Sequence, residues 1–369
     1  MRSTKCNRKG LCGVKAAALC VVVTAAHAAS FNLRGLPSYT PERQVTGTIR
    51  MFGASLGGMV PEWEKGFRKI QPGVRFENRF PSSDAGIAGL VSGVADLGPQ
   101  AREQTLVERL MFFETFGHPV GSVTVATGGY DVEGMADGLV VFVRKDNPLS
   151  KLTMQQLDGI FGAQRTGGFR GFKWSLKNGR AAAGNIRTWG QLGLKGGWAH
   201  REIHTYGYAP TGMSNFFQLK VLNGGDKWNP NYREYVESGT KMIDDDDKSM
   251  SGGLRHMLAH RLANDRYGIA YGVLSQAKDV PGVKVIALAA RAGGPYVQPS
   301  PQSFQDHSYP LSRSIYMYFN RAPGRPLDPR VSEFLRFILS RDAQQAVERH
   351  GGYLPLTPAL AQEGLNRLY

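Results

Sequence analysis

Cysteine is nearly absent from this 369-residue chain. Its three cysteines are Cys6, Cys12 and Cys20. All three lie in an N-terminal segment that we expect to be removed, for reasons given below, so the mature protein would form no disulfide and carry out no thiol chemistry. Its stability would come from the burial of apolar side chains instead.

Residue patterns that mark metal-dependent proteins are also missing. Two histidine pairs have the i, i+4 spacing of zinc proteases (His200 with His204, His256 with His260), but neither first histidine is followed by the glutamate that those enzymes need. The acidic run at residues 244–247 lacks the alternating ligands and the glycine of a calcium loop. The sequence therefore predicts a protein that is not an enzyme and that has neither a metal nor a cofactor.

Long apolar runs are absent after the N-terminus, where no stretch has the ~18 uninterrupted apolar residues of a membrane-spanning helix. The N-terminus itself combines basic residues up to Lys15, an apolar stretch over residues 16–26 and an A-x-A-like site ending at Ala28. A lipoprotein signal would use Cys20, but Leu19 stands where a small residue is expected. We therefore predict a signal peptide over residues 1–28, cleaved after Ala28, and a periplasmic location.

Acidic residues are outnumbered, with 30 Asp and Glu against 45 Lys and Arg and a formal net charge of +15. Removing 28 residues that carry five basic and no acidic side chains leaves 341 residues with a net charge of +10. Such a surplus favours anionic partners. Nucleic-acid binding would require basic residues clustered with aromatic ones, whereas here they are scattered, so we expect no nucleic-acid partner.

Two neighbouring strand-loop-helix units near the start of the mature chain carry serines in their loops. Residues 47–52 and 74–80 have strand patterns, and apolar residues at helical spacing follow Ser55 in one unit and Ser82 and Ser83 in the other. The first helix is expected to begin at Ser55 or just after it. Such loops meet at one edge of an α/β sheet, where ligands bind, and hydroxyls beside a helix N-terminus suit an anion. An equally good interpretation of the spacing is that the serines only cap helices.

Several motifs follow one another along the chain in a recognisable order. They are GAS at 53–55, Trp63 and Phe67, QPGV at 71–74, Ser82 and Ser83, ADLG at 95–98 with Arg102, YPLSRSIYMYFN at 309–320 and GGYLPL at 351–356. This order resembles the periplasmic phosphate-binding (PstS-like) proteins of ABC importers, over nearly the whole mature chain. The resemblance implies an α/β, two-lobe periplasmic binding protein-like (type II) fold that closes on a small anion. It also implies a monomer with an ABC permease as a partner.

The resemblance further implies how the chain divides. Residues 29–46 are interpreted as an extended lead-in. Two segments, 137–144 and 309–320, match the points where the family crosses between lobes, and together they would form a hinge of two crossover strands. The first lobe would comprise residues 47–145 and 303–369, and the second lobe residues 146–302.

The ligand loops depart from the family pattern. Residues 211–214 (Thr-Gly-Met-Ser) fall where the family carries Ser-Gly-Thr, and the arginine usually found a few residues upstream is missing near Tyr208. In the first lobe Ala101 stands where a serine would precede Arg102, and Asp84 adds a carboxylate beside the serine loop. Losing such an arginine would weaken oxyanion binding by ~1.5–3 kcal/mol per charge-assisted hydrogen bond. Another oxyanion, or one with an apolar part that suits the methionine and the nearby tyrosines, therefore stays an alternative to phosphate.

The residues that match the family's ligand positions form the predicted site. They are Ala54, Ser55, Ser82, Ser83 and Arg102 in the first lobe, and Thr211, Gly212 and Ser214 in the second. Arg102 is expected to supply most of the positive charge, and the alternative is a salt bridge to Asp84 or Asp96 that only holds the pocket in shape. The predicted function is binding of phosphate or a related small anion between the lobes for an ABC importer. The alternative is a secreted PstS-like protein that binds another anionic ligand or a polyanion without a transport role.

Overall fold

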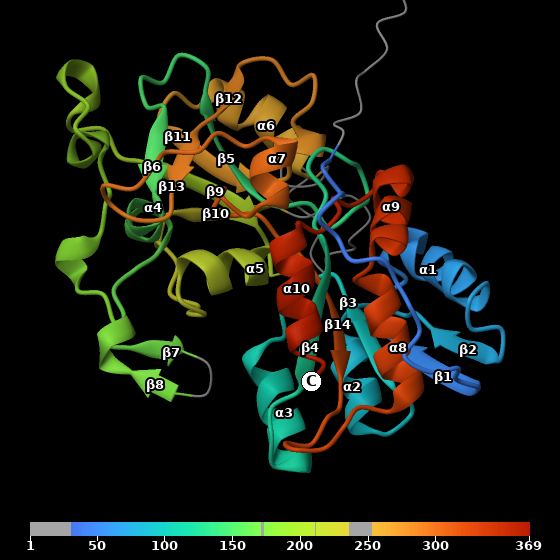
Figure 1. Ribbon diagram of the computed structural model, residues 1–369. Coiled ribbons are helices and arrows are strands. Elements are labelled where there is room, and N and C mark those ends of the chain that lie inside the picture. Colours follow the sequence, from blue (N-terminus) through green and yellow to red (C-terminus); the bar gives the residue numbers. More distant parts are fainter. Residues whose placement is uncertain (1–30, 171–172, 211, 236–252) are drawn as a thin grey trace, which may run out of the picture. The chain divides into compact units, whose positions relative to one another are not determined.

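The computed structural model describes residues 31–170, 173–210, 212–235 and 253–369. Within them, most strands belong to two five-stranded sheets, and helices pack against these sheets (Figure 1). The predicted signal peptide, the acidic run at 244–247 and Thr211 lie outside the described residues. In the part of the chain that is described, no helix is long and apolar enough to cross a membrane.

The first sheet joins strands from both ends of the chain. Its strands are β1 (Gly47–Phe52), β2 (Val74–Arg79), β3 (Leu97–Gln100), β4 (Gly121–Thr127) and β14 (Ser314–Phe319). They lie in the order β2–β1–β3–β14–β4. β1 is parallel to β2 and β3, whereas β14 is antiparallel to β3 and β4. The chain therefore returns to the first sheet after it has built the second.

Successive side chains of β1 point to opposite faces of the first sheet, and helices pack on both faces. The helices are α1 (Met59–Arg68), α2 (Ala85–Val91), α3 (Leu106–Phe116), α8 (Pro329–Ile338), α9 (Arg341–His350) and α10 (Pro358–Asn366). Ile49 and Met51 pack in one core with side chains of α1, α8 and α9. Phe52 packs against a second cluster formed by side chains of α2 and α3, among them Phe112.

The second sheet is built mainly from the middle of the chain. Its strands are β5 (Val140–Arg144), β9 (His204–Tyr208), β10 (Tyr232–Tyr235), β11 (Gly268–Gly272) and β12 (Val283–Val285), in the order β10–β9–β11–β5–β12. Two short pairs accompany it, β6 (Lys151–Thr153) with β13 (Ala287–Ala289) and β7 (Gly168–Arg170) with β8 (Lys173–Ser175). The helices of this region are α4 (Met154–Phe161), α5 (Gly212–Val221), α6 (Gly253–His260) and α7 (Pro301–Gln305).

β5 lies in the second sheet, although the predicted boundary at residue 145 placed it in the first lobe. It pairs antiparallel with β11 and β12. Its residues 140–143 are all buried, as expected of an inner strand that is covered on both faces. Sheet membership therefore favours a second lobe that begins before Val140.

The two segments that connect the sheets are hydrogen-bonded to each other. The amide of Leu139 donates to the carbonyl of Leu311 at 3.0 Å, and the amide of Gly128 donates to the carbonyl of Arg313 at 2.7 Å. Gly128 directly follows β4, Leu139 directly precedes β5, and Leu311 and Arg313 precede β14, which is paired with β4 in the first sheet. Both crossings therefore leave the first sheet at neighbouring strands.

The first helix begins later than predicted. Ser55 precedes a 3-10 turn over Leu56–Gly58, and α1 begins only at Met59. Leu56, Gly57 and Gly58 have φ values of 52°, 61° and 92°, which a right-handed helix cannot contain. Two glycines make this left-handed turn accessible, so the N-terminus of α1 lies beyond the serine loop.

Candidate functional site

A cavity of about 530 Å³ lies beside the loop that follows β1. Its wall combines Ala54 and Ser55 of that loop with Ala101, residues 133–136 of the connection after β4, Met213 of α5, Ser275 of the turn after β11, and Tyr353. A larger cavity, of about 760 Å³, lies beside β7 and β8 and is bordered by none of the predicted site residues. The cavity beside Ser55 is therefore the candidate site, because loops from the first sheet, one connecting segment and the start of α5 meet there.

The loop after β1 offers one side-chain donor to this cavity. The amide of Ala54 already donates to the carbonyl of Pro99 at 2.8 Å, so Ala54 contributes only surface to the wall. Ser55 borders the cavity, and its side chain makes no helix-capping hydrogen bond. Of the two predicted residues in this loop, only Ser55 therefore has a side chain that can donate to an anion.

Residues 53–57 (Gly-Ala-Ser-Leu-Gly) also fit the G-x-S-x-G pattern of hydrolase nucleophile turns. A nucleophilic serine needs a base within hydrogen-bonding distance. Within the described residues, His350 approaches this loop but contacts the Gly57 carbonyl, at 3.1 Å, and not the serine. Ser55 itself has unstrained right-handed dihedrals, φ −68° and ψ −10°. In the part of the chain that the structure describes, His350 is thus not placed as a base for Ser55.

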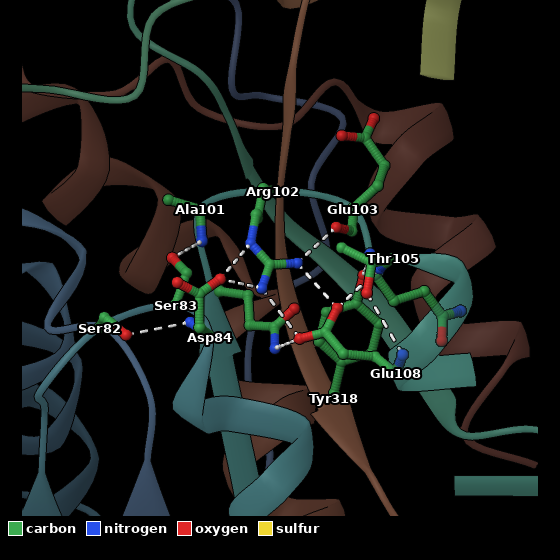
Figure 2. Close-up of polar contacts among 11 residues, drawn as sticks. Ser82, Ser83, Asp84, Ala101, Arg102, Glu103, Thr105, Glu108 and Tyr318 are labelled. Atoms are coloured by element: carbon green, nitrogen blue, oxygen red, sulfur yellow. Dashed lines mark hydrogen bonds and ion pairs between the residues drawn. The ribbon is translucent and has the colours of Figure 1, made fainter. Parts of the chain in front are cut away.

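Ser82 and Ser83 are bonded to neighbouring backbone (Figure 2). The Ser82 hydroxyl accepts from the amide of Asp84 at 3.2 Å, and the Ser83 hydroxyl accepts from the amide of Ala101 at 3.1 Å. Neither serine borders the cavity. The N-cap residue of α2 is Asp84, which makes no side-chain capping bond, so neither serine caps this helix and their contacts instead stabilise the local turn.

Arg102 is buried, and its guanidinium is fully bonded (Figure 2). Nε and Nη2 donate to Asp84, Nη1 and Nη2 donate to Glu108 at 2.8 and 2.9 Å, and Nη1 also donates to the carbonyl of Glu103 at 2.9 Å. All five N–H groups of the side chain are therefore used. Burial alone would lower the pKa of Arg102, but the bonds and charges of Glu108 and Asp84 raise it above its usual value.

Asp96, the other carboxylate considered for Arg102, is paired with Arg50, with Nη2 and Oδ1 2.7 Å apart. Glu108, and not Asp96, is paired with Arg102. The carboxylate of Glu108 also accepts from the amide of Thr105 at 2.7 Å, and the amide of Glu108 donates to the Thr105 hydroxyl at 3.2 Å. Arg102 thus ties the serine loop to the capped start of α3. Among the interactions described, it holds the shape of these loops.

The opposite wall of the cavity is formed by the start of α5. Met213 borders the cavity, and Gly212 and Ser214 flank it in the first turn of the helix. Thr211 lies outside the described residues. The first amides of an α-helix have no partner within the helix and carry partial positive charge, so this helix start suits an anion.

The tyrosines of β9 do not border the cavity. Tyr208 is 1% exposed, and its ring lies 4.7 Å from that of Tyr235 and 5.8 Å from that of Tyr271, measured between centroids. These rings fill the core of the second sheet. The tyrosines are therefore not placed to contact a ligand in this cavity, whereas Met213 borders it.

Two buried charged groups near the cavity are absent from the predicted set. Arg313 is 3% exposed, and its Nη1 lies 3.2 Å from the sulfur of Met213. Asp137 is fully buried, and burial raises its pKa to about 7, although the Ser275 hydroxyl and the Val132 amide oppose this shift. Arg313 belongs to the YPLSRS run. This run predicts the strand by which the chain returns to the first lobe, but it does not indicate where the guanidinium of Arg313 lies.

Comparisons with known proteins identify relatives over nearly the whole chain. A model of the PBP superfamily domain matches residues 40–342. The phosphate-binding protein PstS of Pseudomonas aeruginosa is 31% identical over 335 residues, which cover 90% of this chain and 90% of that protein. The phosphate-binding protein PstS of Staphylococcus aureus is 23% identical over 222 residues, which cover 59% of this chain and 53% of that protein. The crystal structure of PstS from Borrelia burgdorferi is 15% identical and aligns with a TM-score of 0.52 over 84% of this chain and 99% of that chain, which shows a similar fold.

Proposed function

Because this chain belongs to the PBP superfamily, and within it to the family of phosphate-binding PstS proteins, we propose that it is a solute-binding receptor for phosphate or a related small anion. The observation that carries the proposal is the 31% identity to a phosphate-binding PstS, which extends over 90% of both chains. The ligand would occupy the cavity of about 530 Å³ beside Ser55.

The binding residues would come from opposite walls of this cavity. Ser55 would donate through its hydroxyl, and the first turn of α5, with Gly212 and Ser214, would donate through backbone N–H groups. Ala54 would form part of the wall. Ser82, Ser83 and Arg102 would hold the neighbouring loops in place through the contacts of Figure 2, without touching the anion. Such a site binds and releases its ligand unchanged, as expected of a receptor that is not an enzyme.

The partner and the location follow from the same proposal. We propose that the chain is exported by its N-terminal signal peptide, acts as a monomer in the periplasm and delivers its ligand to an ABC permease. The support is the tripartite pattern of residues 1–28 and the family to which the chain belongs.

A second candidate function is binding of a polyanion without transport. The observations that favour it are the net charge of +10 that remains after residue 28 and the absence of the family's second-lobe arginine near Tyr208. Both functions would use positive charge. They differ in the size of the anion that the protein binds.

The test is a calorimetric titration of dialysed, unfolded and refolded protein with inorganic phosphate. We expect one binding site per chain, and a rise in melting temperature because a ligand at ~100 times its Kd stabilises the folded state by ~2.7 kcal/mol. Ser55→Ala should weaken binding, and the matched variant Ser82→Ala should not, because only Ser55 borders the cavity. If phosphate, sulfate, arsenate and phosphonates all leave the melting temperature unchanged at millimolar concentration, a simple oxyanion is the wrong ligand class and the polyanion function is favoured.

A further inference from the structure

Arg313 is a buried arginine that uses little of its hydrogen-bonding capacity. A guanidinium has five N–H donors. Here Nη1 donates to the sulfur of Met213 at 3.2 Å, and a thioether is a weak acceptor. Nε is buried without a partner, and the guanidinium carbon lies 4.9 Å from the centre of the Phe216 ring. The side chain is therefore packed but poorly bonded.

Arg313 also lacks a paired counter-charge. Among the described residues it forms no ion pair. Burial lowers its pKa, and the carboxylate that opposes this most is Glu103, which is itself 3.4 Å from Nζ of Lys220. A buried charge without a partner is costly, so a charge of this kind points to a partner that arrives from outside the chain.

The position of Arg313 shows where such a partner could reach it. Met213, which accepts from Arg313, is at the same time part of the cavity wall and of the first turn of α5. Arg313 itself does not border the cavity, but Met213 contacts both its guanidinium and the cavity. A methionine side chain has three rotatable bonds and adapts easily to a new neighbour.

We propose that Arg313 provides the positive charge that binds a small oxyanion in this cavity, in place of the arginine that the family pattern carries near residue 208. This inference rests on the proposed function, and it assigns to that site a residue from the connection before β14. The ligand class that fits is a tetrahedral oxyanion, because two of its oxygens can accept from one guanidinium fork while others accept from the start of α5. Met213 would turn away from Nη1 when the anion binds.

The competing explanation gives Arg313 a purely structural role. It would balance the buried carboxylate of Glu103 and pack against Phe216 without ever contacting a ligand. The two explanations make opposite predictions for the ligand-free protein. Removing an unpaired buried charge relieves its desolvation, whereas removing a structural counter-charge exposes another unpaired group.

The experiment compares wild type, Arg313→Met, Arg313→Lys and the control Arg50→Met, all dialysed, unfolded and refolded. Arg50 is an arginine whose side chain is 43% exposed and which has no part in the proposed site. Inorganic phosphate is the titrant, and the melting temperature is measured before and after its addition. We expect Arg313→Met to bind phosphate at least ~10-fold more weakly, the equivalent of one lost charge-assisted hydrogen bond, and Arg313→Lys to lose less because it keeps the charge. The control should bind like wild type.

The result in the ligand-free protein separates the two roles. We expect the melting temperature of ligand-free Arg313→Met to equal or exceed that of wild type. Unchanged phosphate affinity in Arg313→Met would overturn the inference while leaving the proposed function intact, and so would a lower melting temperature without loss of affinity. If wild type itself fails to bind phosphate or any other tetrahedral oxyanion, the proposed function is wrong and the inference falls with it.

Discussion

Arg102 and Arg313 are both buried, yet their surroundings are opposite. Arg102 donates all five N–H groups to Asp84, Glu108 and a backbone carbonyl, and these carboxylates raise its pKa. Arg313 donates to one sulfur, has an unbonded Nε and has a pKa lowered by burial. The difference indicates which charge is reserved for the fold and which is available to a ligand.

The comparison supports our proposal that the two arginines have the reverse of the roles expected from the sequence. A guanidinium can bind an oxyanion only with N–H groups that are not committed elsewhere. Arg102 would have to break an ion pair to do so, and its two carboxylate partners would repel the anion. For Arg313 only a weak contact with Met213 has to be given up. We therefore expect Arg102, the arginine that the family pattern places in the ligand site, to bind an anion more poorly than Arg313.

The largest expected effect is on the stability of Arg102→Met. Glu108 is 9% exposed and would become an unpaired buried carboxylate, whereas Asp84 is 80% exposed and can be hydrated, so we expect the free energy of unfolding to fall by about 3–5 kcal/mol. Urea denaturation of the ligand-free protein measures it. Arg50→Met is the control, with an expected loss below about 1 kcal/mol because the Arg50–Asp96 pair is partly exposed. A large loss of phosphate affinity with no loss of stability would show instead that Arg102 contacts the ligand.

The second prediction concerns Asp137, whose raised pKa should make the free energy of unfolding depend on pH. Its folded pKa of about 7 is above the usual value, so its contribution to stability is complete below the pKa of an unfolded aspartate and is lost as pH rises through about 7. We expect Asp137→Asn to remove a decline of up to about 4 kcal/mol in unfolding free energy between pH 4 and 7.5. Urea midpoints of wild type and variant across this range measure the decline. Parallel profiles would show that Asp137 is ionised throughout, as a true counter-charge of Arg313 would be.

Much of the fold could be predicted from the sequence, because apolar spacing and family motifs are local signals. The two-lobe α/β PBP-like fold is confirmed, and β14 and α8 lie where the YPLSRS run and the following apolar pattern place them. The start of α1 was wrong because three left-handed residues intervene after Ser55. Residues 137–144 were interpreted as a crossover strand, and their continuous apolar run could not specify that β5 pairs with β11 and β12.

Unlike the fold, the hydrogen bonding of the two arginines could not be predicted from local sequence signals. It depends on which distant side chains reach each guanidinium. The partner of Arg102 at Asp84 could be proposed from the sequence, but Glu108 became visible only with the turn into α3. The isolation of Arg313 arises from Met213 and Phe216, which are about 100 residues away in the chain. Sequence motifs therefore locate the loops, but they do not show which arginine has N–H groups that are not bonded to other residues.

The smallest expected effect comes from Met213, the side chain that contacts both Arg313 and the cavity. Met213→Thr would restore the residue type of the family's Ser-Gly-Thr loop, remove the thioether beside Nη1 and add a hydroxyl donor at the start of α5. A new hydrogen bond of this kind contributes about 0.5–1.5 kcal/mol, so phosphate should bind roughly 2–10-fold more tightly by calorimetry. Met213→Leu is the matched control, because it removes the sulfur while keeping an apolar side chain of similar size, and we expect its affinity to change less. Weaker binding by the threonine variant would mean that the methionine is itself part of the ligand surface, and a ligand with an apolar portion would then be favoured over phosphate.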